Sequence, residues 1–457
     1  MIFLGIILVY LLGFSIIIFL HRHSETTSIT IDEFLGLAFL IGIGLETIFM
    51  FLFDLLNVKI NAFTLGMSSI AIISWVGFYK REFFKNYLKN ISKISFNSSL
   101  QKVDIAWAVI LLLIIIFLLA NVLKSLFWPT TAYDSVAGYD LMGKVIAAEG
   151  KINVSLFKIG SAGPRGIYPP LIEGSFAYAY IFGSQSSKII SSLTYISLIL
   201  VFYAFLRKYV TNLNAIFFTL LLIGTPEMFA YSSLSLSNIP SAAYASLGLL
   251  YLFMWFENQE KNLLYIASIL LGFNVWSRND GIVFSIAGLV LMVFYAYKNK
   301  SWKEIAIYGS ISFAPFILWT LYLKYKIGIV QDRFVNHLFW NANRFERLML
   351  WIKSLVFNSQ NYGLTFYLFL IALLLNIRDI HRDKFQLLIL ILISFVLYSA
   401  IFYQLDEVKQ GSLDSMMQYS YKRGLFYFIP LVLFYVAVSK PIRLFFLMIE
   451  RHRIGKV

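Results

Sequence analysis

The sequence predicts an all-α polytopic membrane protein. Of the 457 residues, 59% are hydrophobic and only 14% are charged, whereas about a quarter of the residues in soluble domains carry a charge. Apolar stretches long enough to cross a bilayer recur along the whole chain. Tyrosine and phenylalanine are abundant, as expected where many helix ends lie at the level of the lipid headgroups. These three observations exclude a soluble globular domain.

Length and hydropathy indicate about thirteen spans. Their approximate ranges are 1–20, 34–53, 60–79, 105–127, 186–206, 212–224, 240–256, 263–275, 281–297, 304–323, 361–377, 385–404 and 425–447. The first segment lacks the basic start and cleavage site of a signal peptide, so we expect it to be retained. The segments 212–224 and 263–275 are short, and we expect them to be half-helices that line a cavity, because broken helices occur in a membrane only where protein or water covers them. Glu46 lies within the second span, where we expect it to form an interhelical hydrogen bond.

The net charge of +14 comes mostly from short basic loops between the spans. If the spans alternate, these loops share one side of the membrane, which is cytoplasmic by the positive-inside rule. Three long segments, 128–185, 324–361 and 405–424, then lie on the other face. We expect a multi-pass protein of the plasma membrane with its N-terminus outside and its active site on the extracytoplasmic side. The expected partners of the basic charge are anionic membrane lipids, and no nucleic acid.

We divide the chain into two regions. Residues 1–104 hold the N-terminal transmembrane helices and a basic cytoplasmic loop, and residues 105–457 form a second transmembrane module that begins with the loop 128–185. The chain contains no cysteine, which excludes thiol chemistry and disulfides. Five histidines without a tight pair beside a carboxylate in this loop predict no protein-only metal site. A divalent metal as a cofactor remains open.

The first long loop places carboxylates at the membrane edge. Asp134 follows a span that ends near Trp128, and the segment 135–149 has the pattern of an amphipathic helix. Asp134 has two interpretations, as the N-cap of this helix or as a general base that deprotonates an acceptor hydroxyl. Asp140 is a second candidate carboxylate, although its spacing does not bring it to Asp134.

A proline corner follows in the sequence Gly-Pro-Arg-Gly-Ile-Tyr-Pro-Pro-Leu at 163–171. Pro169 and Pro170 fix the backbone, and they predict a short helix along the membrane surface with Glu173 in its first turn. Arg165 is a candidate contact for a phosphate.

Three later motifs complete a pattern. Ser-Asn-Ile-Pro at 237–240 opens a span, Ser-Arg-Asn-Asp-Gly at 277–281 lies between two short apolar segments, and Tyr-Lys-Arg at 421–423 precedes an apolar run. Together with the aspartate-bearing first loop and its Tyr-Pro-Pro-Leu corner, these motifs resemble GT-C glycosyltransferases in order and in topology. That superfamily includes protein O-mannosyltransferases and the lipid A aminoarabinose transferase. The resemblance covers roughly residues 105–440, and Asn238 stands where many members have aspartate.

The resemblance implies a GT-C-like bundle with a non-cytoplasmic catalytic loop that bears amphipathic surface helices. It implies an inverting hexosyl- or pentosyltransferase that moves a sugar from a polyprenyl-phosphate donor to a glycan, lipid or protein acceptor. Asp134 would be the base, with Asp140 as the second catalytic candidate. The expected donor phosphate contacts are Arg278, Arg423, Lys422 and Arg165. The expected substrate contacts are Tyr139, Tyr168, Asn238, Asp280 and Glu173.

Arg278 is also a candidate functional residue on physical grounds, because a charge between membrane segments is costly and usually functional. Asp280 lies two residues away, a spacing that does not share a helix face, so we expect an external anion as the partner of Arg278. The alternative is a simple pair with Asp280 that lines a water-filled cavity.

Two other functions fit the sequence. A transporter or flippase of lipid-linked sugars would explain many spans, but it would favour internal symmetry, which the sequence lacks. A polymerase or ligase of the O-antigen type would favour a large late loop dominated by arginine and histidine, and the segment 324–361 is only modestly of this kind.

Overall fold

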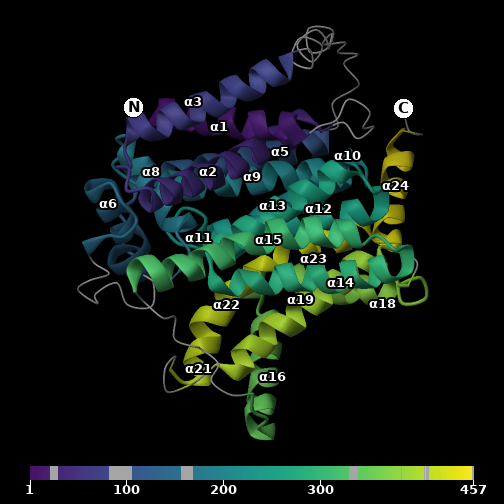
Figure 1. Ribbon diagram of the computed structural model, residues 1–457. Helices are drawn as coiled ribbons and strands as arrows, with labels where there is room; N and C mark the ends of the chain where they lie inside the picture. The colour runs from purple at the N-terminus through teal and green to yellow at the C-terminus, as the bar shows by residue number, and fades with distance from the viewer. Residues whose placement is uncertain are drawn as a thin grey trace.

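The computed structural model describes residues 1–20, 29–81, 105–155, 168–328, 338–381, 383–405, 407 and 411–454. Every regular element within these ranges is a helix. The long helices run side by side in one bundle (Figure 1), which confirms the predicted all-α membrane protein.

Nine helical segments in the described ranges are long and apolar enough to cross a membrane. They are α1 (Ile2–Leu20), α2 (Ile31–Leu55), α3 (Ala62–Tyr79), α5 (Ile105–Phe127), α9 (Lys188–Arg207), α12 (Asn238–Asn258), η3 with α14 (Asn279–Gly281 and Ile282–Asn299), α15 with η4 (Trp302–Tyr322 and Leu323–Ile327) and α19 (Phe385–Gln404). A tenth is possible if the pair Leu413–Tyr427 and Ile429–Val438, bent by 43°, forms one span.

Three further predicted spans correspond to shorter helices, α10 (Asn212–Ile223), α13 (Lys261–Ser277) and α18 (Thr365–Leu375). A helix of 12 residues, such as α10, is only about 18 Å long, against a hydrocarbon core of about 30 Å. Helix length therefore supports nine or ten spans in the described ranges rather than about thirteen. The expectation for the short segments holds in part, because α13 packs between α12 and α15 while α10 lines a pocket described below.

The last predicted span, 425–447, is wrong in its extent. Helix α23 (Ile429–Val438) stops at Ser439, whose backbone is extended, and α24 (Lys440–Ile454) runs in a new direction across the end of the bundle (Figure 1). Lys440 pairs there with Asp379 at 2.6 Å. Helix α24 mixes apolar and charged residues, so it suits the membrane surface rather than the bilayer interior.

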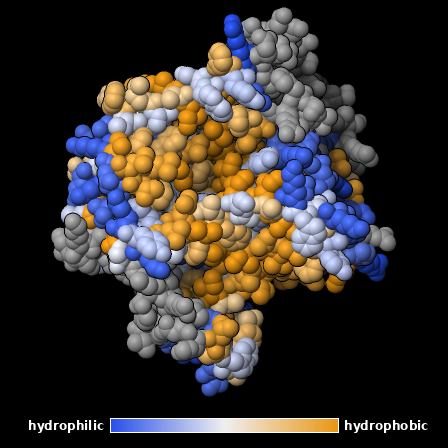
Figure 2. All heavy atoms as spheres, viewed as in Figure 1, coloured by the Kyte–Doolittle hydropathy of each residue, from blue (hydrophilic) through white to orange (hydrophobic). Residues whose placement is uncertain are grey.

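The two ends of the bundle differ in the loops they carry. At one end, ion pairs join the short basic loops to neighbouring helices: Arg207–Asp32, Lys208–Glu33, Lys384–Glu257 and Lys440–Asp379. At the other end, Arg347–Asp414 and Arg423–Asp134 join the three long segments. Figure 2 shows an apolar belt between two more polar ends. The alternation of the spans is therefore supported, whereas the side of the membrane that each end faces stays a prediction.

Several short helices lie between the long helices along the chain. They are η1 (Ser135–Tyr139), α6 (Asp140–Glu149), α8 (Leu171–Ile181), α11 (Pro226–Tyr231), α16 (Ala342–Val356), α17 (Ser359–Tyr362), α21 (Leu413–Ser415), η5 (Met416–Tyr421), α22 (Lys422–Gly424) and η6 (Leu425–Tyr427). Helix α16 stands across the direction of the bundle, below α19 in Figure 1. The others gather at the end that carries Asp134.

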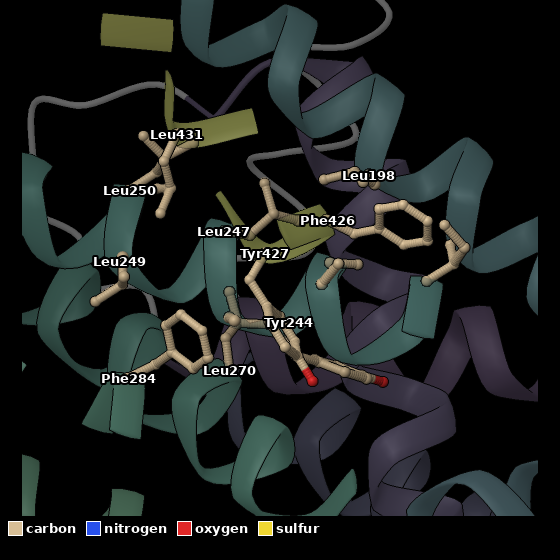
Figure 3. Close-up of a cluster of buried hydrophobic side chains, with 14 of the residues drawn as sticks. Leu198, Tyr244, Leu247, Leu249, Leu250, Leu270, Phe284, Phe426, Tyr427 and Leu431 are labelled. Atoms are coloured by element: carbon tan, nitrogen blue, oxygen red, sulfur yellow. The ribbon is translucent and has the colours of Figure 1, made fainter. Parts of the chain in front are cut away.

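Helix α12 forms the centre of the bundle, because all of its residues from Asn238 to Phe256 are buried. Its side chains pack against those of α9, α13, α14 and η6, with Tyr244 and Leu247 among the residues shown in Figure 3. A helix that is apolar on all sides belongs inside a bundle. This core fixes the ends of α12 and α13, from which two of the predicted motifs project.

The N-terminal helices pack directly on the rest of the bundle. Glu33 of α2 accepts hydrogen bonds from Lys208 and from Tyr251. Within α2, Glu46 accepts a hydrogen bond of 2.5 Å from Ser69 of α3, which confirms the expected interhelical contact. The division of the chain at residue 104 stays a prediction.

Candidate functional site

Asp134 lies at the start of the helical segment that follows α5. Its backbone is already helical and its side chain forms no capping hydrogen bond, so the N-cap interpretation is wrong. Instead, its Oδ2 atom accepts a hydrogen bond of 2.8 Å from Nη1 of Arg423. The Asp134 side chain is 29% exposed, so its carboxylate stays within reach of a ligand at the membrane edge.

Arg423 and Lys422 bring two adjacent cations to this point. The Nε atom of Arg423 donates to the carbonyl oxygen of Tyr419 at 2.7 Å, which orients the guanidinium toward Asp134. Lys422 pairs with Glu227 of α11 at 2.6 Å. Gly424 permits this arrangement, because a Cβ atom there would lie 1.8 Å from the hydroxyl oxygen of Tyr398. The structure thus brings together the first and third long segments.

A second polar cluster surrounds Arg278. Its Nε atom lies 2.8 Å from Oδ1 of Asp280, and its Nη1 atom donates to Oγ of Ser237 at 3.0 Å. The structure thus shows the alternative interpretation, the pair of Arg278 with Asp280, and the argument from spacing against this pair is wrong. Arg278 is extended and residues 279–281 form a tight 3₁₀ turn, so the rule for helix faces does not apply.

The Arg278 cluster continues toward Asp134. Ser237 donates to the hydroxyl of Tyr139 at 3.0 Å, and the guanidinium of Arg278 lies 5.7 Å from the ring centre of Tyr168. Burial raises the pKa of Tyr139 well above its usual range, so its hydroxyl stays neutral. Tyr139 is five residues from Asp134, about one turn of the π-helix η1, so it connects the two clusters along the chain.

Three side-chain atoms in the Arg278 cluster remain without a hydrogen-bond partner in the part of the chain that the structure describes. They are Oδ2 of Asp280 and both amide atoms of Asn279, and all three are buried. A buried polar atom without a partner is costly, so a ligand or an ordered water is the natural complement of this turn.

Asp140 has a different environment from Asp134. Its Oδ1 atom accepts hydrogen bonds from Tyr180 and Ser187, both at 2.5 Å, and Lys144 pairs with its Oδ2 atom at 2.9 Å. The hydrogen bond to Asp140 also raises the pKa of Lys144. Because these contacts occupy both oxygens, Asp140 fixes α6 against the start of α9.

The proline corner opens a helix as predicted, since α8 begins at Leu171 directly after Pro170. The predicted place of this helix is wrong, because α8 is buried between α6 and α2 instead of lying on the membrane surface. Glu173 is buried in its first turn. Asn238 is buried at the first residue of α12. Arg165 lies outside the described residues.

Sequence reasoning gave no role to Glu227, and none to Ser237 beyond its place in the Ser-Asn-Ile-Pro motif. Glu227 had a signal, because it is the only charged residue between Lys208 and Glu257, and an isolated charge among apolar residues is usually functional. Ser237 is one of many serines, and only the structure shows that it connects Arg278 to Tyr139.

An apolar pocket of about 350 Å³ lies beside the Lys422–Glu227 pair. Its walls come from α5, α10, α17 and the start of α18, and the lining residues are Leu113, Phe117, Leu220, Leu221, Gly224, Thr225, Tyr362, Gly363, Leu364 and Thr365. Tyr362 links the pocket to the cations, because its hydroxyl donates to the carbonyl oxygen of Lys422 at 2.6 Å. Thr225 lies two residues before Glu227. The pocket and the charged cluster are therefore neighbours.

Among the described residues, no group of three or more histidine, aspartate or glutamate side chains is placed to hold a metal ion. No protein-family model, no curated protein and no solved structure matches the chain.

Proposed function

We propose that this protein is an inverting glycosyltransferase of GT-C type that moves a sugar from a polyprenyl-phosphate donor to an acceptor hydroxyl. One observation carries the proposal. The ion pairs Arg423–Asp134 and Lys422–Glu227 lie side by side in the chain, and Tyr362 links the backbone of Lys422 to an apolar pocket between helices. A phosphate that carries a long hydrocarbon chain needs both features. Cations bind its oxygens, and an apolar surface binds its chain.

In the proposed reaction, the donor phosphate takes the place of Asp134 on the guanidinium of Arg423. The released carboxylate of Asp134 accepts the proton of the acceptor hydroxyl while that oxygen forms a bond to the anomeric carbon. The bond between the anomeric carbon and the phosphate oxygen breaks, and polyprenyl phosphate leaves with the electron pair. Arg423 and Lys422 stabilise the charge that develops on the leaving phosphate. A single displacement of this kind inverts the configuration at the anomeric carbon.

The Arg278 cluster fits the sugar in this scheme. The amide of Asn279 and the Oδ2 atom of Asp280 are buried polar atoms that sugar hydroxyls complement. Tyr168 supplies an aromatic ring beside them. Arg278 then acts as a positioning residue, because its own hydrogen bonds hold Asp280 and Ser237.

The proposed orientation follows the positive-inside rule, which places the Asp134 end on the extracytoplasmic face of the plasma membrane. The acceptor is a hydroxyl of a glycan, a lipid or a protein.

The proposal is tested by incubating the purified protein in lipid nanodiscs with radiolabelled polyprenyl-phosphate sugars. Release of the sugar from its carrier is the readout, because it does not require the acceptor to be known when water serves as a slow acceptor. We expect release above a boiled control with at least one sugar. A protein that only transports lipid-linked sugars would bind the donor and release no carrier phosphate, and this result would contradict the proposal.

A further inference from the structure

A second cavity lies at the Asp134 end of the bundle, outside the site described above. Its volume is about 290 Å³, near the lower limit of the roughly 300–1,000 Å³ of small-molecule sites. Three separate segments form it, namely the end of α2 with the turn after it, the end of α6 with the turn after it, and η4. The lining residues are Asp54, Asn57, Val58, Lys59, Glu149, Gly150, Lys151, Asn153 and Lys326.

Hydrogen bonds fix the walls of this cavity. Oδ1 of Asp54 accepts the backbone N–H groups of Ile152 and Asn153 at 2.8 and 3.2 Å. The hydroxyl of Tyr322, next to η4, donates to the other oxygen of Asp54. The backbone N–H of Ile60 donates to the carbonyl oxygen of Gly150 at 2.8 Å. The three segments are therefore held together without a ligand, so the cavity is pre-formed.

The charges that line the cavity favour an anion. Lys59, Lys151 and Lys326 bring three positive charges, against two negative charges from Asp54 and Glu149, so the net charge is +1 (three minus two). The carboxylate of Asp54 is already engaged by three donors. A metal cation would meet three ammonium groups, which repel it.

Two of these lysines lack a carboxylate partner among the described residues. Lys326 donates to the neutral Oδ1 atom of Asn57 at 2.7 Å. Lys59 packs over Gly150 and forms no ion pair with the residues that the structure describes. Lys151, in contrast, pairs with Glu149 at 3.3 Å. Lys59 and Lys326 are therefore the two ammonium groups available to a ligand.

We propose that this cavity binds the phosphate group of a small molecule or of a lipid headgroup. Phosphate has several acceptor oxygens, and ammonium groups from different segments can bind it together. The cavity lies at the far end of α6 from Asp140, about 14 Å along the helix axis, so it is separate from the proposed transfer site. The inference does not rest on the proposed function, because binding is measured without turnover.

Binding of glucose 1-phosphate to the protein in phosphatidylcholine nanodiscs, measured by calorimetry, tests this proposal. We expect saturable binding, with glucose as a neutral probe that does not bind. The double variant Lys59→Gln/Lys326→Gln should lower the affinity at least tenfold, since each charge-assisted contact is worth about that much. Lys324→Gln is the matched control, because Lys324 is exposed on the same turn but does not line the cavity.

A second arm separates the two sources of phosphate. Nanodiscs that contain phosphatidylglycerol should weaken the apparent affinity for glucose 1-phosphate if a lipid headgroup enters the cavity, and this competition should disappear in the double variant. If phosphatidylglycerol leaves the affinity for glucose 1-phosphate unchanged, the ligand of the cavity is a soluble phosphate. The proposal is overturned if glucose 1-phosphate does not bind, or if the double variant and the Lys324→Gln control bind it as tightly as the unaltered protein.

Discussion

The guanidinium of Arg423 binds two acceptors at once, the carbonyl oxygen of Tyr419 and the carboxylate of Asp134. The first contact fixes the direction of the side chain, and the second is the one that a phosphate can replace. Both side chains of the pair remain partly exposed, at 19% for Arg423 and 29% for Asp134, so exchange of partners requires no opening of the core. A pair that formed only for stability would gain little from this exposed position.

We expect substitutions of Arg278 to change mainly the free energy of unfolding. Its side chain and that of Asp280 are 18% and 14% exposed, and loss of the guanidinium leaves the carboxylate of Asp280 in a largely buried position. We expect Arg278→Ala to destabilise the protein by about 2–3 kcal/mol, measured by thermal or denaturant unfolding in detergent.

The double variant Arg278→Ala/Asp280→Asn should recover part of this stability, because it removes the orphaned charge. Asp280→Asn alone is the control for the double-mutant cycle. If the two single effects simply add, the ion pair does not couple these residues and the assignment is wrong.

At the scale of residues, Asp134, Lys422 and Arg423 could be chosen as candidates from the sequence because the motifs that carry them are local. It did not predict that Asp134 pairs with Arg423, since 289 residues separate the two. The sequence also suggested that Asp280 could not reach Arg278, because residues two apart do not share a face of an α-helix. This was wrong because the chain forms a 3₁₀ turn there instead of an α-helix.

At the scale of elements, α10 and the start of α18 are important because they form the apolar pocket beside the cations. We expect Leu221→Trp to fill this pocket and to weaken binding of a long-chain polyprenyl phosphate at least tenfold, since each displaced methylene contributes about 0.8 kcal/mol. Binding of a short-chain analogue should change little. Competition for a fluorescent polyprenyl phosphate measures both affinities.

Leu374→Trp is the matched control for this variant, because Leu374 lies on α18 and is 61% exposed, away from the pocket lining. Equal effects of the two tryptophans on the long-chain ligand would show that the pocket does not hold the chain.

The predicted spans agree with the structure where an apolar run ends at turn or charged residues, as in α5 and α19. The predicted span 425–447 was wrong because it continued past Ser439, Lys440 and Arg443 into the apolar stretch 444–447, and hydropathy does not register a change of direction. The place of α8 was wrong for a related reason. Its sequence indicates a short helix, but only its packing against α6 and α2 shows that it is buried.

At the scale of the whole molecule, the two ends of the bundle carry different charged groups, and the orientation decides which compartment would supply the acceptor of the proposed transfer. The chain has no cysteine of its own, so a single introduced cysteine reports its position without background. Ser354→Cys on α16 should react with an impermeant thiol reagent added to intact cells. Lys298→Cys, at the opposite end on α14, should react only after the membrane is opened. The reverse pattern would place the Asp134 end in the cytoplasm.

We propose Asp134 as the general base and Arg423 as the contact of the donor phosphate. The most direct test is to measure donor affinity and sugar release on the same preparation of Asp134→Asn. Affinity should stay equal or rise, because the phosphate no longer competes with a carboxylate for Arg423. Release should fall by about 100-fold or more, the usual scale for loss of a general base. Release at the unaltered rate from a folded Asp134→Asn variant would contradict the account.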